Sequence, residues 1–371
     1  MNHITTFVGL DVHKSSISIA FASAIVGQEP QFVKKITSDV RKLLKELRKL
    51  GAPGSIRVCY EAGPTGYGIL RRLRQEGFAA EVIAPAMTPK SASDKVKTDR
   101  RDALKLAECL RNGQLTSIYV PTEQEEALRD LIRAREDLKR VDMNTKRQMS
   151  SMLLRYGRAW EGKSNWTKAH LVWISQQRFE HQATTEAHSH YLGELHSLKE
   201  KVAHLDQLIH EEALKLPNAP LYKAFMTVKG IKALTAATLV VEIGDFRRFK
   251  TAGRFMSFLG LTPSLYASGD RAVRGRITKA GNRRLRRLLV ESAWSYRCAP
   301  HVSRDLQKQS QGIAAGPRAI AWQAQKRLHR KTKAMQARGM NHKKMLIAVA
   351  RELAGFVWAI AQEDKLVESA A

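Results

Sequence analysis

The sequence predicts an α/β domain at residues 1–120, a long helical segment at 121–215 and a mostly α-helical domain at 216–371. Three observations lead to this division. Strand and helix patterns alternate up to residue 120, which is typical of an α/β layer domain. Pro121 then marks a change of composition, and apolar residues recur every three or four positions after it. The run KLPNAP at 215–220 contains two prolines and indicates the second boundary.

Each element of the first domain has its own local pattern. Runs rich in apolar and β-branched residues predict strands in TTFVGLDV, SSISIAFAS, SIRVCYEA and FAAEVIAPA. Helical spacing predicts helices at 39–50, 64–77 and 98–113. Thr98 serves as the N-cap of the last helix, and Gly113 ends it.

Two long amphipathic patterns, at 122–156 and 188–214, predict two long helices in the middle segment. The pair suggests a coiled-coil hairpin or a dimer seam. An ordinary helical bundle has the same periodicity, so both interpretations stay open. Residues 157–187 are polar and predict no particular element.

The third region opens with a turn that resembles half of a helix-hairpin-helix. Lys229 and Gly230 precede an Ala-rich helix within residues 226–243. Backbone N–H groups at such a helix start can hold a DNA phosphate, although a plain helical hairpin fits the spacing equally well. The remainder, to residue 371, is helical and basic.

Charge is the most informative bulk property of this chain. The 371 residues contain 63 Lys and Arg against 35 Asp and Glu, a formal net charge of +28, and the sequence pI is near 10.2. This excess favours a polyanionic partner such as DNA or RNA. A protein that is basic for solubility alone is a weaker explanation, because the charge is clustered.

Cysteine usage and hydropathy restrict the compartment. The three cysteines are far apart, and their spacing predicts neither a disulfide framework nor a zinc site, which fits a reducing cytoplasm. The N-terminus is too polar for a signal peptide. No apolar run approaches the ~20 residues of a membrane span. We therefore expect a cytoplasmic protein without a membrane partner.

Four carboxylates of the first domain stand out. Asp11 ends the first strand, Glu61 ends the third predicted strand, and Asp99 and Asp102 lie three positions apart at a helix start. Carboxyl ends of strands meet at one edge of an α/β sheet, so these acids are expected to converge. Converging carboxylates repel one another unless a divalent cation lies among them, and oxygen ligands suit Mg²⁺ or Mn²⁺. Two such ions about 4 Å apart are a common device for breaking phosphodiesters.

These acids also have simpler explanations. Asp99 could have no role beyond a favourable interaction with the helix macrodipole, and Asp102 could have no role beyond an ion pair with Arg101 or Lys105. Asp11 is harder to explain in this way, because it follows an apolar strand where an unpaired carboxylate is costly.

A basic stretch in the third region predicts a nucleic-acid surface. Residues 268–290 contain eight basic residues and one acid, Asp270. Such a surface neutralises phosphates and makes binding salt-dependent. Residues 326–344 contain eight more and no acid, which predicts a second nucleic-acid surface or a disordered basic arm. The eight basic residues of the first stretch are Arg271, Arg274, Arg276, Lys279, Arg283, Arg284, Arg286 and Arg287.

Several of these motifs resemble one known family. GLDVHK, YEAGPTGYG and KTDRRDA are similar to the three blocks of the RuvC-like, RNase H-like DEDD domain of IS110-family transposases, the bridge-RNA-guided recombinases of bacterial insertion sequences. GIKALTAATLVVEIGDFRRF and FLGLTPSLYASGDRAVRGRITKAGNRRLRRLL resemble the C-terminal transposase domain of that family. The matches cover most of residues 5–300, and the tail at 301–371 suggests the IS1111 branch.

The resemblance implies a composite active site. Asp11, Glu61, Asp99 and Asp102 would hold Mg²⁺ or Mn²⁺, and Ser268 of YASGD would occupy the place of the serine that joins covalently to DNA. Without the resemblance, Ser268 is an ordinary turn serine. Tyr266 is a second candidate nucleophile, two residues from the matching position. The basic residues of 271–287 would steady the DNA, with Lys229 and Gly230 as a further contact.

The implied protein is a DNA recombinase that excises and inserts its own mobile element. The resemblance also implies a bridge RNA, a homo-oligomer (a dimer or a tetramer) and association with the bacterial nucleoid. Three alternatives stay open: a RuvC-like Mg²⁺-dependent nuclease or Holliday junction resolvase that uses water, a site-specific DNA invertase, and a non-catalytic nucleic-acid-binding scaffold.

Overall fold

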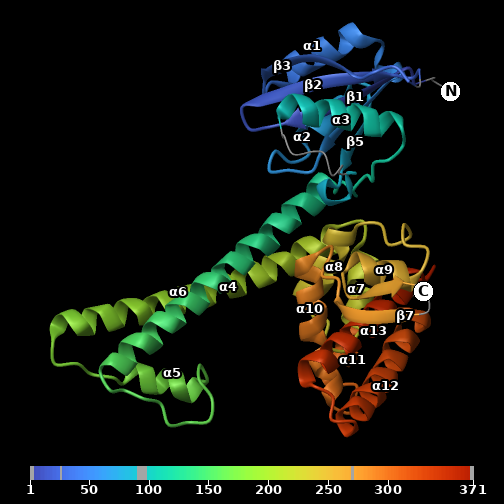
Figure 1. Ribbon diagram of the computed structural model, residues 1–371. Helices are drawn as coiled ribbons and strands as arrows, with labels where there is room; N and C mark the ends of the chain where they lie inside the picture. Colours follow the sequence, from blue (N-terminus) through green and yellow to red (C-terminus); the bar gives the residue numbers. More distant parts are fainter. Residues whose placement is uncertain (1–3, 26, 90–97, 269–270, 368–371) are drawn as a thin grey trace. The chain divides into compact units, whose positions relative to one another are not determined.

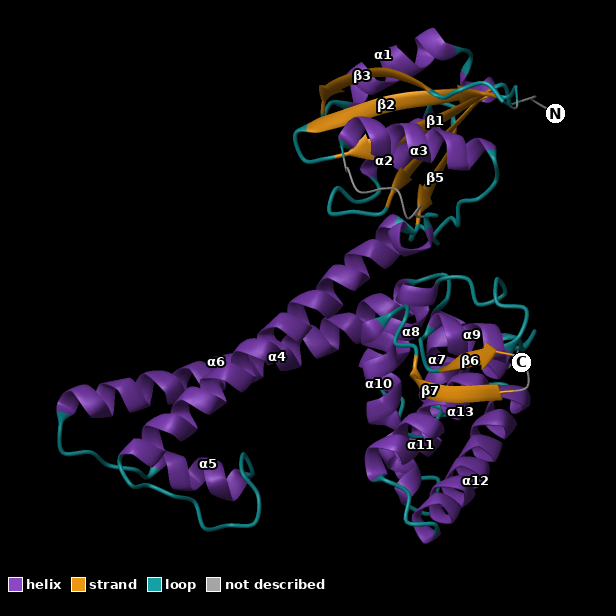
Figure 2. Cartoon of the chain, in the orientation of Figure 1, coloured by secondary structure: helices purple, strands orange, loops and turns teal. Residues whose placement is uncertain are grey.

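The computed structural model of the protein describes residues 4–25, 27–89, 98–268 and 271–367. The side chains of residues 267, 268, 271, 272 and 274 lie outside this description. The chain divides into two compact units, Met1–Val120 and Pro121–Ala371. Each unit is described by itself (Figures 1 and 2).

Unit 1 is built on a mixed five-stranded sheet with the strand order β3-β2-β1-β4-β5. β1, β2 and β3 are antiparallel neighbours, whereas β1, β4 and β5 run parallel to one another. The four predicted strands are confirmed, and β3 is an addition that the sequence did not predict. The strands are β1 (Thr6–Val12), β2 (Ser16–Ser23), β3 (Gln31–Thr37), β4 (Ile56–Glu61) and β5 (Ala79–Ile83).

Helices cover both faces of this sheet. One face packs under α1 (Val40–Leu50) and α2 (Gly68–Gln75), and its core includes Leu10 and Tyr60. The other face packs under α3 (Asp99–Arg111), where Cys59 and Ile83 meet leucines of the helix. The three predicted helices are therefore confirmed. The 3₁₀ turns η1 (Pro53–Ser55) and η2 (Pro85–Met87) complete the described elements of the unit.

Unit 2 begins with two long helices, α4 (Glu123–Arg155) and α6 (Gln182–Lys215), which lie side by side (Figure 1). A capping box of Thr122 and Glu125 starts α4. Arg135 of α4 pairs with Asp206 of α6 at 2.6 Å. Both predicted helices are confirmed, and α5 (Lys168–Ser175) lies between them in the chain. The coiled coil and the dimer seam stay predictions.

The rest of unit 2 is mostly helical around one large apolar core. The sequence did not predict the two-stranded antiparallel sheet of β6 and β7, which exposes Leu265, Tyr266 and Val273. Residues 326–344 form the end of α12 and the start of α13, so the disordered-arm alternative is wrong. The elements are α7 (Ala219–Met226), α8 (Ala233–Ile243), α9 (Ala252–Phe258), β6 (Pro263–Ser268), β7 (Arg271–Ile277), α10 (Arg283–Ala293), η3 (Trp294–Arg297), α11 (Arg304–Gln309), α12 (Ala315–Ala337) and α13 (His342–Ala361).

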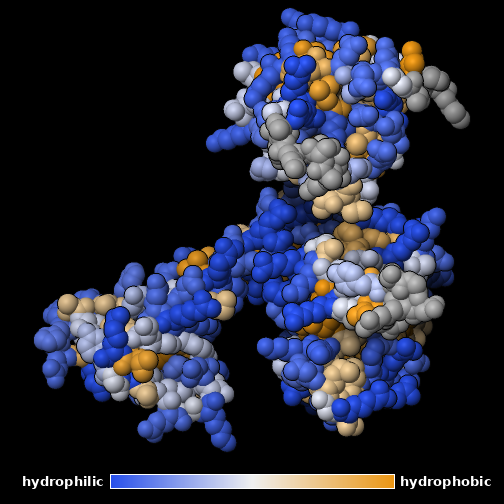
Figure 3. All heavy atoms as spheres, in the orientation of Figure 1, coloured by the Kyte–Doolittle hydropathy of each residue, from blue (hydrophilic) through white to orange (hydrophobic). Residues whose placement is uncertain are grey.

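The surface is largely hydrophilic. Blue, hydrophilic side chains cover most of the face drawn in Figure 3. Among the helices of the described ranges, none combines the length and the apolar character that crossing a membrane requires.

Candidate functional site

Four residues of unit 1 lie in one row across the sheet. Lys35 on β3 pairs with Ser18 on β2, and Ser18 pairs with Asp11 on β1. The residues that precede Asp11 and Glu61 pair with each other between the parallel strands β1 and β4. Adjacent strands are about 4.8 Å apart, so Glu61 continues the row beside Asp11.

This row faces α3. Side chains alternate between the two faces of a strand. Because Leu10 and Tyr60 enter the core on the α1 and α2 side, Asp11 and Glu61 point to the opposite face. The row therefore lies at the edge of the sheet that α3 approaches with its N-terminal end.

A glycine lets α3 come close to β1. A Cβ at Gly9 would lie 2.4 Å from the carbonyl oxygen of Ala103, so a larger residue would displace the helix. Thr98 caps α3, and its side chain accepts a backbone N–H of the first turn. Asp99 and Asp102 both lie in that first turn. Gly9 and Thr98 together thus bring the two helix carboxylates to the end of β1.

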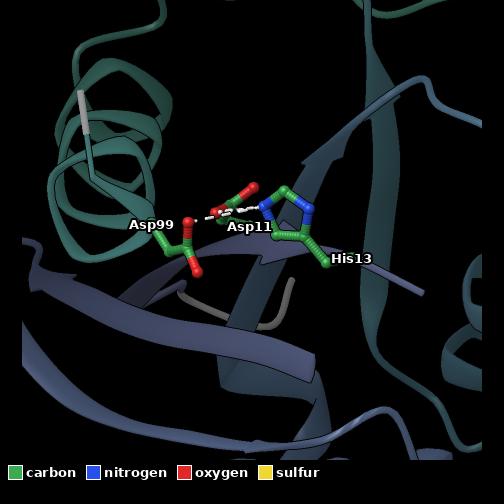
Figure 4. A group of neighbouring side chains, drawn as sticks. All are labelled: Asp11, His13 and Asp99. Carbon is green, nitrogen blue, oxygen red and sulfur yellow. Dashed lines mark hydrogen bonds and ion pairs between the residues drawn. The ribbon is translucent and has the colours of Figure 1, made fainter. Parts of the chain in front are cut away.

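Three side chains converge at this point (Figure 4). Nε2 of His13 lies 3.1 Å from Oδ2 of Asp11 and 3.6 Å from Oδ1 of Asp99. One ligand atom from each residue lies within 4.8 Å of the others. Lys35 donates from Nζ to Oδ2 of Asp99 at 2.7 Å. The predicted acids Asp11 and Asp99 are therefore neighbours in the structure.

The pKa values of the two carboxyls move in opposite directions. Burial raises the pKa of Asp11, and the charges of Asp99 and Asp102 raise it further, against the lowering effect of His13. The hydrogen bond from Lys35 lowers the pKa of Asp99. Asp102 is thus close enough to act on Asp11. The site concentrates negative charge around Asp11, and a cation would stabilise that charge.

Glu61 lies at the neighbouring strand end, but its carboxylate has another partner. Its Oε1 accepts a hydrogen bond from Oγ1 of Thr88 at 2.8 Å. The three-residue cluster that could hold an ion contains neither Glu61 nor Asp102. The structure thus brings two of the four predicted acids together with His13, and it places the other two at the same end of the sheet.

Sequence reasoning missed two residues of this site. His13 follows Asp11 by two positions, just after β1 ends at Val12, and its side chain turns toward Asp11. Lys35 lies on β3, the strand that the sequence did not predict. Both belong to one edge of the sheet and are found only when the strand register is known.

The donor set fits a divalent cation. Carboxylate oxygens bind Mg²⁺ and Mn²⁺, and an imidazole nitrogen is a common ligand of first-row transition metals. Asp11, Asp99 and His13 present such atoms on one side of the sheet, next to the further acids Asp102 and Glu61.

The predicted nucleophile lies on the hairpin of unit 2. Ser268 ends β6, and its backbone pairs with Arg271 of β7. The side chains of Ser268, Arg271 and Arg274 are among those that the structure does not describe. Tyr266, the second candidate, is 72% exposed.

The arginines of α10 contact carboxylates and carbonyls of their own unit. Arg284 pairs with Glu136 of α4 at 2.7 Å and with Glu242 of α8 at 3.0 Å. Arg287 pairs with Glu136 at 2.7 Å and with Glu291 at 2.9 Å. Their guanidinium groups tie α10 to neighbouring helices, so these two arginines have a structural role that the basic stretch did not suggest.

Other predicted DNA contacts are also engaged within the unit. Arg286 donates to the carbonyl of Leu259 at 2.9 Å, and Lys229 donates to that of Ala299 at 2.8 Å. Gly230 has a φ of +88°, and a Cβ there would lie 2.5 Å from the carbonyl oxygen of Ser292. The turn at 229–231 therefore packs against η3 and its flanks. Among the remaining predicted contacts with described side chains, the exposed ones are Arg276, Lys279 and Arg283.

A mixed sheet with helices on both faces and acids at adjacent strand ends fits an RNase H-like DEDD domain. Comparison with known proteins gives the family: residues 8–157 match the DEDD domain of IS110 transposases, and residues 222–307 match the family described as Transposase IS116/IS110/IS902. The chain belongs to the IS110 family of transposases, enzymes that cut and rejoin DNA.

The alignments with three individual relatives cover between 76% and 98% of the chain. The putative transposase y4qE of Sinorhizobium fredii is 36% identical over 364 residues, which are 98% of this chain and 90% of that protein. The transposase for insertion sequence element IS1533 of Leptospira borgpetersenii is 31% identical over 89% of this chain and 96% of that protein. The transposase for insertion sequence element IS1111A of Coxiella burnetii is 24% identical over 76% of this chain and 71% of that protein.

Proposed function

We propose that this transposase excises and inserts a mobile element through a composite site made of the acidic row of unit 1 and Ser268. The name acidic row is used for the two carboxylates of the sheet row, Asp11 and Glu61, together with Asp99 and Asp102 in the first turn of α3. The observation that carries the proposal is the convergence of Asp11, Asp99 and His13 on the α3 face of the sheet. A helix-dipole role for Asp99, or a single ion pair for Asp102, does not explain why an Asp11 side chain that is only 18% exposed lies beside them.

We further propose that the acidic row holds Mg²⁺ or Mn²⁺. Such an ion, when bound, supplies Lewis acidity and lowers the cost of charge on the phosphate oxygens. The carboxylates would fix the position of the ion. The close packing of α3 against β1 at Gly9 holds the carboxylates in place. A rigid first turn of α3 therefore matters as much as the carboxylates themselves.

Ser268 supplies the nucleophile in this proposal. Its Oγ forms a bond to the phosphorus of one DNA strand while the bond from that phosphorus to the leaving DNA oxygen breaks. The hydroxyl loses its proton, and the leaving oxygen takes one up, so the step needs no further reactant. Reversal with a second DNA end rejoins the strand.

The test is a covalent adduct. Purified protein is incubated with Mg²⁺, labelled element-end DNA and RNA transcribed from the element, and the products are separated under denaturing conditions. We expect a protein–DNA adduct that Ser268→Ala abolishes and that Tyr266→Phe preserves. Cutting that persists without adduct in Ser268→Ala would instead indicate a water-dependent nuclease.

Mixing two inactive variants tests whether one subunit supplies both halves of the site. Asp11→Asn and Ser268→Ala are each expected to be inactive alone. Activity in the mixture would mean that the acids and the serine come from different subunits. Continued inactivity, with both variants folded and oligomeric, would mean that one chain supplies both.

The resemblance also supports a bridge RNA, a homo-oligomer and work on the bacterial nucleoid, where the DNA lies. The +28 net charge agrees with nucleic-acid partners. We expect purified protein to retain RNA, and RNase treatment to remove sequence-directed cutting while the protein stays folded. Light scattering of the RNA-bound protein would give the number of subunits.

A further inference from the structure

His13 has a position that a simple hydrogen-bond partner does not need. It follows β1, and its backbone N–H donates to the carbonyl of Ser16 at 2.8 Å, which fixes the start of the β1–β2 turn. Its Nε2 faces carboxylate oxygens of two different elements, Asp11 on β1 and Asp99 on α3 (Figure 4). One N–H bond points along one line, so it can serve only one of those oxygens well.

The distances match those between ligands of one ion. Two ligands bound about 2.1 Å from an ion are about 3.0 Å apart at a right angle and about 3.4 Å apart at a tetrahedral angle. The measured spacings from Nε2 of His13 are 3.1 Å to Asp11 and 3.6 Å to Asp99. Both spacings from Nε2 are close to those of neighbouring corners of a coordination shell, and the two carboxylate oxygens lie within 4.8 Å of each other.

Charge balance around Asp99 supports the same arrangement. Lys35 contacts Oδ2 of Asp99, whereas His13 faces Oδ1. The oxygen turned toward His13 is thus the one that Lys35 leaves available. Asp11 likewise turns its Oδ2 toward His13. Both carboxylates direct an oxygen to the side where the imidazole nitrogen lies.

We propose that Nε2 of His13 is a ligand of the divalent cation that Asp11 and Asp99 hold. The inference rests on the proposed function, because it adds a nitrogen to the oxygen ligands proposed there. A nitrogen ligand favours first-row transition metals over Mg²⁺. The site is therefore a mixed oxygen and nitrogen site that prefers Mn²⁺ to Mg²⁺.

The test uses Mn²⁺ alone with the full-length protein. Pulsed electron paramagnetic resonance of bound Mn²⁺ detects a directly bound ¹⁴N nucleus, and labelling the protein with ¹⁵N-histidine changes the modulation. We expect this nitrogen signal in the wild-type protein, with the change on labelling. The measurement needs no variant, so a folding defect cannot obscure it.

Variants then assign the nitrogen. His13→Ala and His13→Gln should lose the signal and weaken Mn²⁺ binding about tenfold, with a smaller change for Mg²⁺. The matched control is His204→Ala, which removes an exposed histidine of α6 and should leave both properties unchanged.

The outcomes separate this inference from the proposed function. Bound Mn²⁺ that Asp11→Asn removes but that shows no histidine nitrogen would overturn the role of His13 and keep the metal site. A nitrogen signal that persists in both His13 variants would also overturn it. If Asp11→Asn leaves Mn²⁺ binding unchanged, the metal site of the proposed function fails as well.

Discussion

The acidic row of unit 1 and the arginine-rich helix α10 of unit 2 are both groups of like charge, but the fold treats them differently. In unit 1, the carboxylates lie close together, and burial and the charge of Asp99 raise the pKa of Asp11. In unit 2, Arg284 and Arg287 each contact two carboxylates, and Glu136 of α4 is shared between them. The charge of the acidic row can therefore interact with a bound cation, whereas the charges of Arg284 and Arg287 are paired within the protein.

The comparison shows what a charge count can and cannot indicate. A run of arginines makes a surface positive only if no carboxylates of the folded protein pair with those arginines. Glu136 is 148 positions from Arg284 in the chain, and no local pattern links them. A cluster of acids that packing brings together, so that the pKa of Asp11 is raised, is the stronger indication of a ligand site.

The largest expected effect belongs to Asp11. Asp11→Asn keeps the shape of the side chain but removes the charge, and we expect DNA cleavage to fall by about 10³-fold or more, as loss of several kcal/mol of charge stabilisation predicts. The midpoint of thermal unfolding should not be lowered, because the amide relieves repulsion by Asp99 and Asp102.

The control for Asp11 is the same substitution at Asp39. Asp39 is the N-cap of α1, and asparagine caps helices equally well. Asp39→Asn should therefore retain cleavage and stability. Equal cleavage by Asp11→Asn and the wild-type protein would contradict a catalytic acidic row.

The second effect concerns stability in unit 2. Arg284→Leu leaves Glu136 and Glu242 without their shared partner in a partly buried place, and we expect a loss of about 2 kcal/mol in the free energy of unfolding. Urea unfolding followed by circular dichroism measures it. The neighbouring exposed Arg283→Leu should change stability by less than about 0.5 kcal/mol. Equal losses in the two variants would show that the pairing of Arg284 is unimportant.

A third, smaller effect tests the cation of the acidic row. Lys35 is 53% exposed and holds Asp99 at 2.7 Å. Removing this competing charge with Lys35→Met should raise Mn²⁺ affinity about fivefold, a gain of about 1 kcal/mol typical of exposed ion pairs. Isothermal titration measures the affinity.

Lys34→Met is the matched control, because Lys34 is adjacent in β3 but pairs with Glu46 of α1 on the other face. It should leave Mn²⁺ affinity unchanged. A similar increase in both variants would mean that net charge, and not contact with Asp99, sets the affinity.

The fold of unit 1 was largely predictable because each element has a local pattern. Runs rich in apolar and β-branched residues predicted β1, β2, β4 and β5, and Thr98 and the helical spacing predicted α3. β3 was missed because an edge strand carries lysines and buries only Ile36. The hairpin of β6 and β7 was missed because its arginines and glycines resemble a loop.

The site was predictable only where residue types alone carry information. Asp11 could be chosen because an unpaired carboxylate after an apolar strand is costly. Asp99 and Asp102 could be chosen because they lie three positions apart at a helix start, in a motif that resembles a DEDD block. The contribution of His13 depends on the packing of α3, which brings Asp99 beside the end of β1, and that of Lys35 depends on two strand pairings. Such contacts depend on tertiary packing, which no local pattern contains.

The smallest expected effect tests the comparison most directly, because it sets two arginines of one helix against each other. Both arginines are exposed, but Arg287 also pairs with Glu136 and Glu291. If such an ion pair keeps an exposed arginine from DNA, Arg283→Ala should weaken DNA binding about threefold and reduce the salt slope of binding by about one. Arg287→Ala should leave the slope unchanged, since its guanidinium is already neutralised within the protein. Titrations of fluorescent duplex DNA between 50 and 200 mM salt, about the range over which such slopes are measured, give both numbers. Equal slopes for the two variants would mean that α10 meets DNA through neither arginine, or that binding breaks the ion pairs of Arg287, and in either case the contrast between the two regions would be lost.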